Sequence, residues 1–330
     1  MDQRDARSHY YPRVIYAGVD EAGYGPLLGP LCIGASAFRV NDHRDIATPP
    51  DLWKLFDRAV CRKVKDSRRR IPISDSKKLK RAGEDPLIHL ERGVLAFCSE
   101  NSLADDRALF DELGVHTRIS AATPWHATAL ALPVSLSPFD VTIARNMVAR
   151  AYAHSGASLA HLGVAALDAP AFNALYATLR NKALVNMSLI FDAVRTVDLL
   201  RGDEPAFIAV DRQGGRAQYA EELETHIARG APVRTISESE DQSTYEIGEG
   251  LIISFEVGAE ERHLPVALAS MGAKYVRELF MRRLNAFFIG HMPALAPTAG
   301  YVEDGRRFLA EVTTILAATD IPQRDFVRSV

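Results

Sequence analysis

The chain has 330 residues, of which 47% are hydrophobic and 25% are charged, a composition typical of soluble globular proteins. No run approaches the roughly 20 consecutive apolar residues that a membrane-spanning helix needs, so no membrane partner is expected. The formal net charge of −3 argues, taken alone, against a general nucleic-acid binder.

The N-terminal residues 1–12 are predicted to form a short polar tail, because the opening MDQRDARSHYYPR lacks the apolar core of a secretory signal. The three cysteines, Cys32, Cys61 and Cys98, are far apart in the sequence. Such an odd, dispersed set predicts neither a disulfide framework nor a zinc knuckle. A reducing cytoplasm is therefore the expected location.

Residues 14–30, with the sequence VIYAGVDEAGYGPLLGP, begin as an apolar β-branched run and then break into glycine turns. Asp20 and Glu21 therefore lie where a predicted strand leaves the core. Adjacent residues of a strand point to opposite faces. Two acids in a row therefore need either a divalent cation or a bend of the chain that brings both carboxylates to one side. An acidic strand end beside a turn is the alternative interpretation of this pair.

The segment 31–40 predicts a second strand, joined to the first as a hairpin by a tight Gly/Pro connection, and a short helix is expected at 51–60. Residues 58–81 carry 11 Lys and Arg against 2 Asp, a local charge of +9, and the other 306 residues carry a net −12. One basic patch on an acidic body is typical of a protein that holds a polyanion at one place. A solvated basic loop is the alternative.

Between residues 86 and 200 the patterns predict four helices and one strand. The helices are expected at 86–100, 140–153, 168–179 and 184–200, and the strand at 164–167, with Asp140 as a helix cap. The segment 101–137 gives only a weak signal and is interpreted as an insertion.

A second apolar run that ends in an acid occurs at residues 206–211, AFIAVD, where Asp211 is followed by two glycines within four residues. Further strands are expected at 233–237 and 250–257, with a solvated acidic loop between them, and helices at 264–288 and 303–318. Early hairpins followed by β–α–β units indicate an α/β fold.

The helix predicted at 264–288 is apolar nearly all round, which is typical of a buried helix. It nevertheless carries Ser270, Lys274 and Glu278 at four-residue spacing, and hence on one face. Burying Lys274 and Glu278 costs several kcal/mol each unless they are paired or face a polar cavity. A structural Lys–Glu pair is the alternative to a functional one.

In open α/β sheets the C-terminal ends of the strands border the ligand crevice, so Asp20, Glu21, Asp211 and Glu278 are expected to converge there. Four carboxylates in one crevice repel each other. The simplest compensation is one or two hard divalent cations, Mg²⁺ or Mn²⁺. Two such ions about 3.5–4 Å apart would clamp the attacking and leaving oxygens of a phosphodiester.

Several segments of the chain resemble the type 2 ribonucleases H (ribonuclease HII). The more specific matches are GVDEAGYGPLLGP at 18–30 and ISDSKKL at 73–79, joined by IAVD at 208–211 and PVALASMGAKYVRE at 265–278. LGVAALDAPAFNAL at 162–175 and PTAGYVEDGRRF at 297–308 are weaker matches. The order and spacing agree over residues 14–308, interrupted by insertions near 41–72 and 101–160.

The resemblance implies one ribonuclease H-like domain over residues 13–330. Its fold would be a mixed sheet, with antiparallel hairpins and then parallel β–α–β units, flanked by helices and followed by a C-terminal helical extension. The implied activity is endonucleolytic hydrolysis of the RNA strand of RNA–DNA hybrids, leaving 5′-phosphate ends and using two Mg²⁺ or Mn²⁺ ions. Asp20, Glu21, Asp211 and Glu278 would be the catalytic metal ligands, with Asp20 and Asp211 shared between the ions.

The resemblance also implies a set of nucleic-acid-binding residues, in which the lysines hold phosphates and so position the substrate. They are Gly23, Tyr24, Gly25, Ser76, Lys77, Lys78, Ser270 and Lys274. The sequence does not indicate whether the chain has a protein partner.

This chain departs from the family at Tyr24, where a basic residue is usual, at Glu278, where Asp is usual, and in the DRQGG segment after Asp211. Glu278 keeps the charge and adds a methylene, and Tyr24 offers stacking or a hydroxyl in place of a cation. Two alternatives therefore stand beside the hybrid nuclease. One is a nucleic-acid-binding protein that keeps the fold without turnover, and the other is a nuclease for another nucleic acid.

Overall fold

The computed structural model describes residues 11–329 except 44, 68, 80–82, 84, 116–122 and 213. The first strand begins at Tyr11, so the last two residues of the predicted tail, Tyr11 and Pro12, belong to the sheet.

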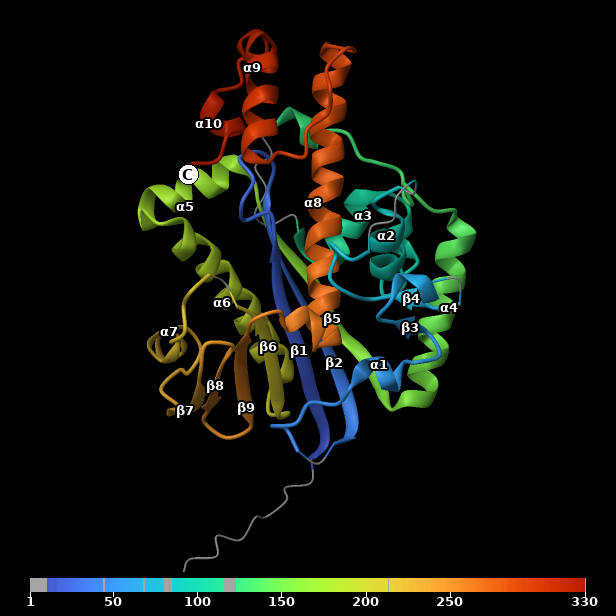
Figure 1. Cartoon of the computed structure of the whole chain (residues 1–330), viewed down its shortest axis with the longest axis vertical. Coiled ribbons are helices and arrows are strands. Elements are labelled where there is room, and N and C mark those ends of the chain that lie inside the picture. The colour runs from blue at the N-terminus through green and yellow to red at the C-terminus, as the bar shows by residue number, and fades with distance from the viewer. Residues whose placement is uncertain are drawn as a thin grey trace, which may run out of the picture.

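A seven-stranded mixed sheet forms the centre of the structure (Figure 1). Its strands are β1 (Tyr11–Ala22), β2 (Leu31–His43), β5 (Ala157–Leu167), β6 (Ala206–Asp211), β7 (Val233–Glu238), β8 (Gln242–Ile247) and β9 (Leu251–Glu256). The spatial order is β5-β2-β1-β6-β9-β8-β7. The central pairs β1–β6 and β6–β9 are parallel and the outer pairs are antiparallel, which confirms the predicted ribonuclease H-like mixed sheet. A separate small parallel pair joins β3 (Val60–Cys61) and β4 (Ile71–Pro72).

Helices flank this sheet and follow it. They are α1 (Leu52–Leu55), α2 (Ile88–Leu95), α3 (Asp106–Leu113), α4 (Pro138–Ser155), α5 (Ala169–Leu179), α6 (Lys182–Arg201), α7 (Ala220–His226), α8 (Leu264–His291), α9 (Val302–Ala318) and α10 (Gln323–Phe326). Short 3₁₀ turns are η1 (Val64–Asp66), η2 (Asn101–Leu103), η4 (Pro124–His126) and η5 (Ala259–Glu261). Among the residues that the structure describes, no helix is long and apolar enough to cross a membrane.

The two faces of β1 support different layers, because alternate side chains of a strand point to opposite sides. Val14 and Tyr16 pack in the cluster beneath α8, whereas Ile15, Ala17 and Val19 pack in the cluster beneath α6. Figure 1 shows α8 crossing one face of the sheet, with α2 and α4 on the same side. The sheet is therefore buried on both sides at its centre, where the strand ends carry the acids.

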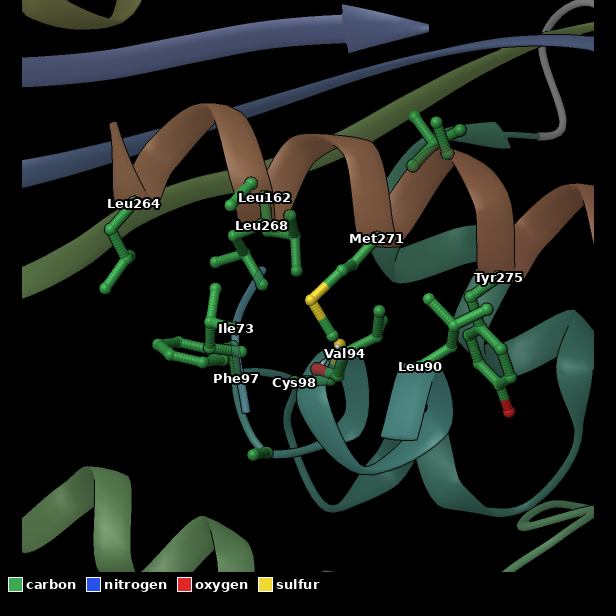
Figure 2. Packing of buried hydrophobic residues seen from close by; sticks show 14 of the residues in the cluster. Ile73, Leu90, Val94, Phe97, Cys98, Leu162, Leu264, Leu268, Met271 and Tyr275 are labelled. Carbon is green, nitrogen blue, oxygen red and sulfur yellow. Dashed lines mark hydrogen bonds between the residues drawn. The ribbon is translucent and has the colours of Figure 1, made fainter. Parts of the chain in front are cut away.

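Helix α8 lies directly on the strands, because two glycines leave room for its backbone. A Cβ atom built on Gly18 of β1 would lie 2.1 Å from the backbone nitrogen of Val266, and one on Gly34 of β2 would lie 2.1 Å from the carbonyl oxygen of Ala269. The other side of α8 packs on α2, and Figure 2 shows Met271 reaching toward Val94.

The segment 101–137 holds α3 and a loop, both tied to α8 by buried polar groups. The Glu91 carboxylate accepts three backbone N–H groups, those of Val134, Ser135 and Leu136, and the Tyr275 hydroxyl at 2.6 Å. Arg283 of α8 donates from Nε to Asp106 of α3 at 2.6 Å, and both side chains are buried. These contacts attach the segment interpreted as an insertion firmly to the core.

The C-terminal helical extension is present as predicted, and it packs on the end of α8. Beyond α10 the chain returns to the Gly23–Pro30 loop, where Val327 forms an antiparallel bridge with Leu28. The buried Arg328 donates to the carbonyl oxygen of Pro26. The loop after β1 is thus supported by residues from the far end of the sequence.

Several local predictions differ from the structure. The helix expected at 86–100 ends at Leu95, and the strand expected at 164–167 begins at Ala157. The helix expected at 51–60 is only the single turn α1, because the chain enters β3 at Val60. Asp140 lies in the first turn of α4, whose cap is Ser137, with the Asp140 N–H donating to the Ser137 hydroxyl at 3.2 Å. The acidic stretch expected to be a loop contains a strand, β8, between β7 and β9.

Candidate metal site

Three carboxylates meet at the C-terminal ends of two neighbouring parallel strands. The register of β1 and β6 runs to Val19 opposite Val210, so Asp20 and Asp211 are the next residues on each strand. Asp20, Glu21 and Asp211 each offer an oxygen, and these atoms lie within 4.8 Å of one another. The convergence of acids from distant parts of the chain follows from the parallel pairing of β1 and β6.

The electrostatics of this group favour a cation. Asp20 is 7% exposed. Burial, Glu21 and Asp211 raise its pKa well above the usual range, and a hydrogen bond with Ser270 acts in the opposite direction. Burial and Glu260 raise the pKa of Asp211 to about 7, although Asp211 accepts the Ala259 N–H at 2.9 Å. Because their pKa values are raised, Asp20 and Asp211 hold protons more readily than ordinary carboxylates when no cation is bound. A divalent ion would replace these protons.

Glu260 is a fourth acid beside Asp211, and the sequence reasoning missed it. It lies in the three-residue turn η5 between β9 and α8. Its carboxylate acts directly on Asp211. Within the described residues, its buried Oε2 has no hydrogen-bond partner. A buried carboxylate oxygen without a donor, next to other acids, fits a ligand of a hard cation. The sequence signal that could have found Glu260 is its position shortly after Glu256, the acid that ends β9, between the strand predicted at 250–257 and the helix predicted at 264–288.

Glu278 lies outside this group of carboxylates. Ser270 approaches Asp20, and Glu278 is eight residues further along α8, a rise of about 12 Å from Ser270 along the helix axis. The Glu278 carboxylate pairs with Lys274, Nζ to Oε1, at 2.7 Å. Of the polar stripe on this helix, the structure brings Ser270 to the acids and pairs the other two residues with each other.

The glycine loop after β1 is fixed against α8 by Arg277. This buried guanidinium donates to the carbonyl oxygens of Pro30 at 2.6 Å and of Leu28 at 3.1 Å. Gly23 has φ +90°, and a Cβ atom there would lie 2.7 Å from the Pro30 oxygen, so the position requires glycine. Gly25 is exposed with open space around it.

Tyr24, between those glycines, is half-buried, and the Lys182 ammonium of α6 lies 5.1 Å from its ring centroid. This is within the range of a cation–π contact. Helix α6 therefore places a cation next to position 24.

The basic stretch lies beside the acids through the η5 turn. Lys78 Nζ is 2.5 Å from Glu261 Oε1, and Arg62 donates to the Glu261 carbonyl oxygen at 2.7 Å while stacking on Trp53. Lys77 is exposed and Ser76 is half-buried in the same turn. Three basic residues of this stretch, Arg68, Lys80 and Arg81, lie outside the described residues.

On the other side of Asp211, Arg212 joins two loops. Its guanidinium donates to the carbonyl oxygens of Ser239 at 3.0 Å and Glu240 at 2.5 Å, and also to that of Arg216. These residues line a cavity of about 820 Å³. Arg212 thus joins the loops that form the wall of this cavity through their carbonyl groups.

Comparison with family models and with curated proteins finds no match. Among solved structures, the chain is similar to the ribonuclease HII of the PCNA:RNase HII complex from Archaeoglobus fulgidus, with 17% identity, a TM-score of 0.41 and coverage of 95% of this chain and 93% of that one. It is also similar to the ribonuclease H2 of Pyrococcus horikoshii OT3, with 16% identity, a TM-score of 0.44 and coverage of 95% and 92%.

A third similar structure is Bst-RNase HIII in complex with Mn²⁺, with 17% identity, a TM-score of 0.43 and coverage of 96% of this chain and 66% of that one. All three are type 2 ribonucleases H, the family that the motifs of this chain resemble.

Proposed function

We propose that this chain is a ribonuclease H-like endonuclease that hydrolyses the RNA strand of RNA–DNA hybrids with Mg²⁺ or Mn²⁺ and leaves 5′-phosphate ends. The observation that carries the proposal is the group of Asp20, Glu21 and Asp211, with Glu260 beside it. An all-oxygen, strongly acidic donor set fits hard divalent cations. The motif resemblance gives the substrate class.

In this proposal Asp20 and Asp211 are the central metal ligands, and Glu21 and Glu260 complete the set. Glu260 takes the role that the sequence pattern had suggested for Glu278. Bound ions would activate water and stabilise the charge that develops on the leaving 3′-oxygen.

The chain's own residues orient these ligands. The Ser270 side chain hydrogen-bonds Asp20, and the Ala259 N–H fixes Asp211 Oδ1 at 2.9 Å. Both contacts lower the pKa of the carboxyl that they touch. They therefore favour the ionised form that a metal ligand requires.

Substrate contact is proposed along the basic stretch and the glycine loop. Lys77 and Lys78 would hold backbone phosphates next to η5, and Gly23 and Gly25 permit close approach of the nucleic acid to the backbone. Tyr24, backed by Lys182, offers a ring for stacking at the loop.

The test is hybrid cleavage by purified protein, with four variants compared side by side. Asp20→Asn and Asp211→Asn should each lower the cleavage rate by roughly 10³-fold or more, because each removes a central ligand charge. Glu260→Gln should also lower the rate strongly, whereas Glu278→Gln should stay within about fivefold of wild type, since it loses only a partly exposed ion pair. Equal activity of Asp20→Asn and wild type would refute the carboxylate mechanism.

The specific observation that favours a second function is Tyr24, which stands where the family that the motifs resemble usually has a basic residue. A protein that binds without turnover would show salt-sensitive hybrid binding and no cleavage with either ion. Calorimetric titration with Mn²⁺ separates the two functions, because a pure binder needs no tight metal site. A cleavage assay on three substrates, an RNA–DNA hybrid, DNA with one embedded ribonucleotide and plain DNA, distinguishes a hybrid nuclease from a nuclease for another nucleic acid.

A further inference from the structure

Three buried polar side chains beside the candidate metal site are connected to one another and are not among its proposed ligands. The Tyr16 hydroxyl of β1 contacts His263 Nδ1, and His263 Nε2 lies 2.9 Å from Glu256 Oε2. All three side chains are buried. Burial raises the pKa of Tyr16 well above its usual range, so the phenol stays protonated. Its O–H donates a hydrogen bond to His263 Nδ1. His263 Nε2–H then donates to Glu256.

Glu256 stands next to Asp211 in the sheet, since the two residues are partners in the β6–β9 register. Both of its oxygens are already used. Oε1 accepts the Ser254 hydroxyl at 2.8 Å, and Oε2 accepts His263 and Arg262, the latter at 3.0 Å. Burial acts to raise the pKa of Glu256, but the His263 and Ser254 hydrogen bonds outweigh it and lower the pKa. Glu256 is therefore a charged anchor and not a spare metal ligand.

The η5 turn is held at both ends by this arrangement. At its start, the Ala259 N–H donates to Asp211 at 2.9 Å. At its end, the His263 N–H donates to the Ala259 carbonyl oxygen at 2.9 Å, while the His263 ring is bound to Glu256. Glu260 lies between these two attachments, with its carboxylate beside Asp211.

We infer that Glu256 and His263 are positioning residues that hold Glu260 at the metal site. This role rests on the proposed function, because it presupposes that the acids bind a divalent cation. Like charges on Asp211 and Glu260 repel each other, so the turn that carries Glu260 has to be held in place by other elements. Lys78 and Arg62 hold it through Glu261, and the anchor from β9 adds a further attachment at His263.

The test measures Mn²⁺ binding directly, by calorimetry on the full chain without substrate. Glu256→Gln and His263→Leu each remove one partner of the anchor, and each should weaken Mn²⁺ binding by about 10–100-fold, as is typical of groups that orient metal ligands. His263→Gln should restore affinity to within about threefold of wild type, because its amide nitrogen can still donate to Glu256.

Glu91→Gln is the matched control for lost stability. Glu91 is an equally buried carboxylate with a full set of hydrogen bonds, and it lies on α2, on the opposite side of α8 from the sheet. Its substitution should lower the melting temperature and leave Mn²⁺ affinity unchanged.

Weakened binding in Glu256→Gln and His263→Leu, with rescue in His263→Gln, supports the positioning role. Wild-type affinity in the first two variants overturns it, as does equal weakening in Glu91→Gln. If wild-type protein itself binds no Mn²⁺, the metal site of the proposed function is refuted, and the positioning role falls with it.

Discussion

The close contact between β1 and α8 makes Gly18 a strong test of the structure. Gly18 lies two residues before Asp20 on the same face of β1, and Val266 lies four residues before Ser270 on α8. The separation of strand and helix at Gly18 therefore sets where Ser270 meets Asp20. Replacing Gly18 with alanine adds one methyl group at this contact.

The magnitude follows from the space available. The new Cβ would lie 2.1 Å from the Val266 nitrogen, against 3.4 Å for ordinary contact, so α8 must retreat by about 1.3 Å. Overpacking of this kind costs about 1–3 kcal/mol in the free energy of unfolding. A displacement of about 1 Å at the site lowers the rate by roughly 10²-fold.

Urea unfolding measures the first effect, and hybrid cleavage at a temperature where the variant is folded measures the second. The matched control is Gly272→Ala on the same helix, where the nearest atom to a new Cβ is 3.5 Å away. That change should leave activity intact and add up to about 1 kcal/mol of stability. A Gly18→Ala protein as stable as wild type would refute the packing of α8 on β1, whatever the activity proves to be.

Two further predictions concern charge. In the metal-free protein, burial and Glu260 raise the pKa of Asp211 from 3.8 to about 7, so proton binding stabilises the fold below about pH 4 and this contribution is lost as the pH rises through 7. The melting temperature of metal-free protein should therefore fall between about pH 4 and pH 7, and Mn²⁺ should reverse the fall; a flat profile contradicts the buried acid group. Arg283→Leu should lower the free energy of unfolding by about 3–5 kcal/mol in urea titrations, because it leaves Asp106 buried without its cation. A loss under about 1 kcal/mol would mean that this pair is not buried.

The strands that carry the acids were predictable because their signal is local. Short β-branched runs that end in an acid gave β1 and β6, and parallel pairing brings their ends together. Helix α5 was equally clear, since Asp168 caps it and Pro170 lies in its first turn.

The remaining parts of the site depend on contacts that no local pattern encodes. Four-residue spacing places Ser270 and Glu278 on one face of α8, but it does not say how far along the sheet each residue lies. Glu260 escaped notice because a three-residue turn has no periodicity. The polar strand β8, QSTYEI, resembled a solvated loop until its pairing with β9 was known.

The loop at residues 23–30 borders the acids, yet two of its supports, Gly300 and Arg328, lie far from it in the sequence. Gly300 accepts the Leu27 N–H at 2.7 Å, and the carbonyl oxygen of Leu27 accepts the Arg328 N–H at 3.1 Å. During synthesis the strand with Asp20 and Glu21 therefore emerges some 300 residues before the clamp on its neighbouring loop. A chain that lacks Gly300 and Arg328 would carry the acids but would lose these two contacts to the neighbouring loop.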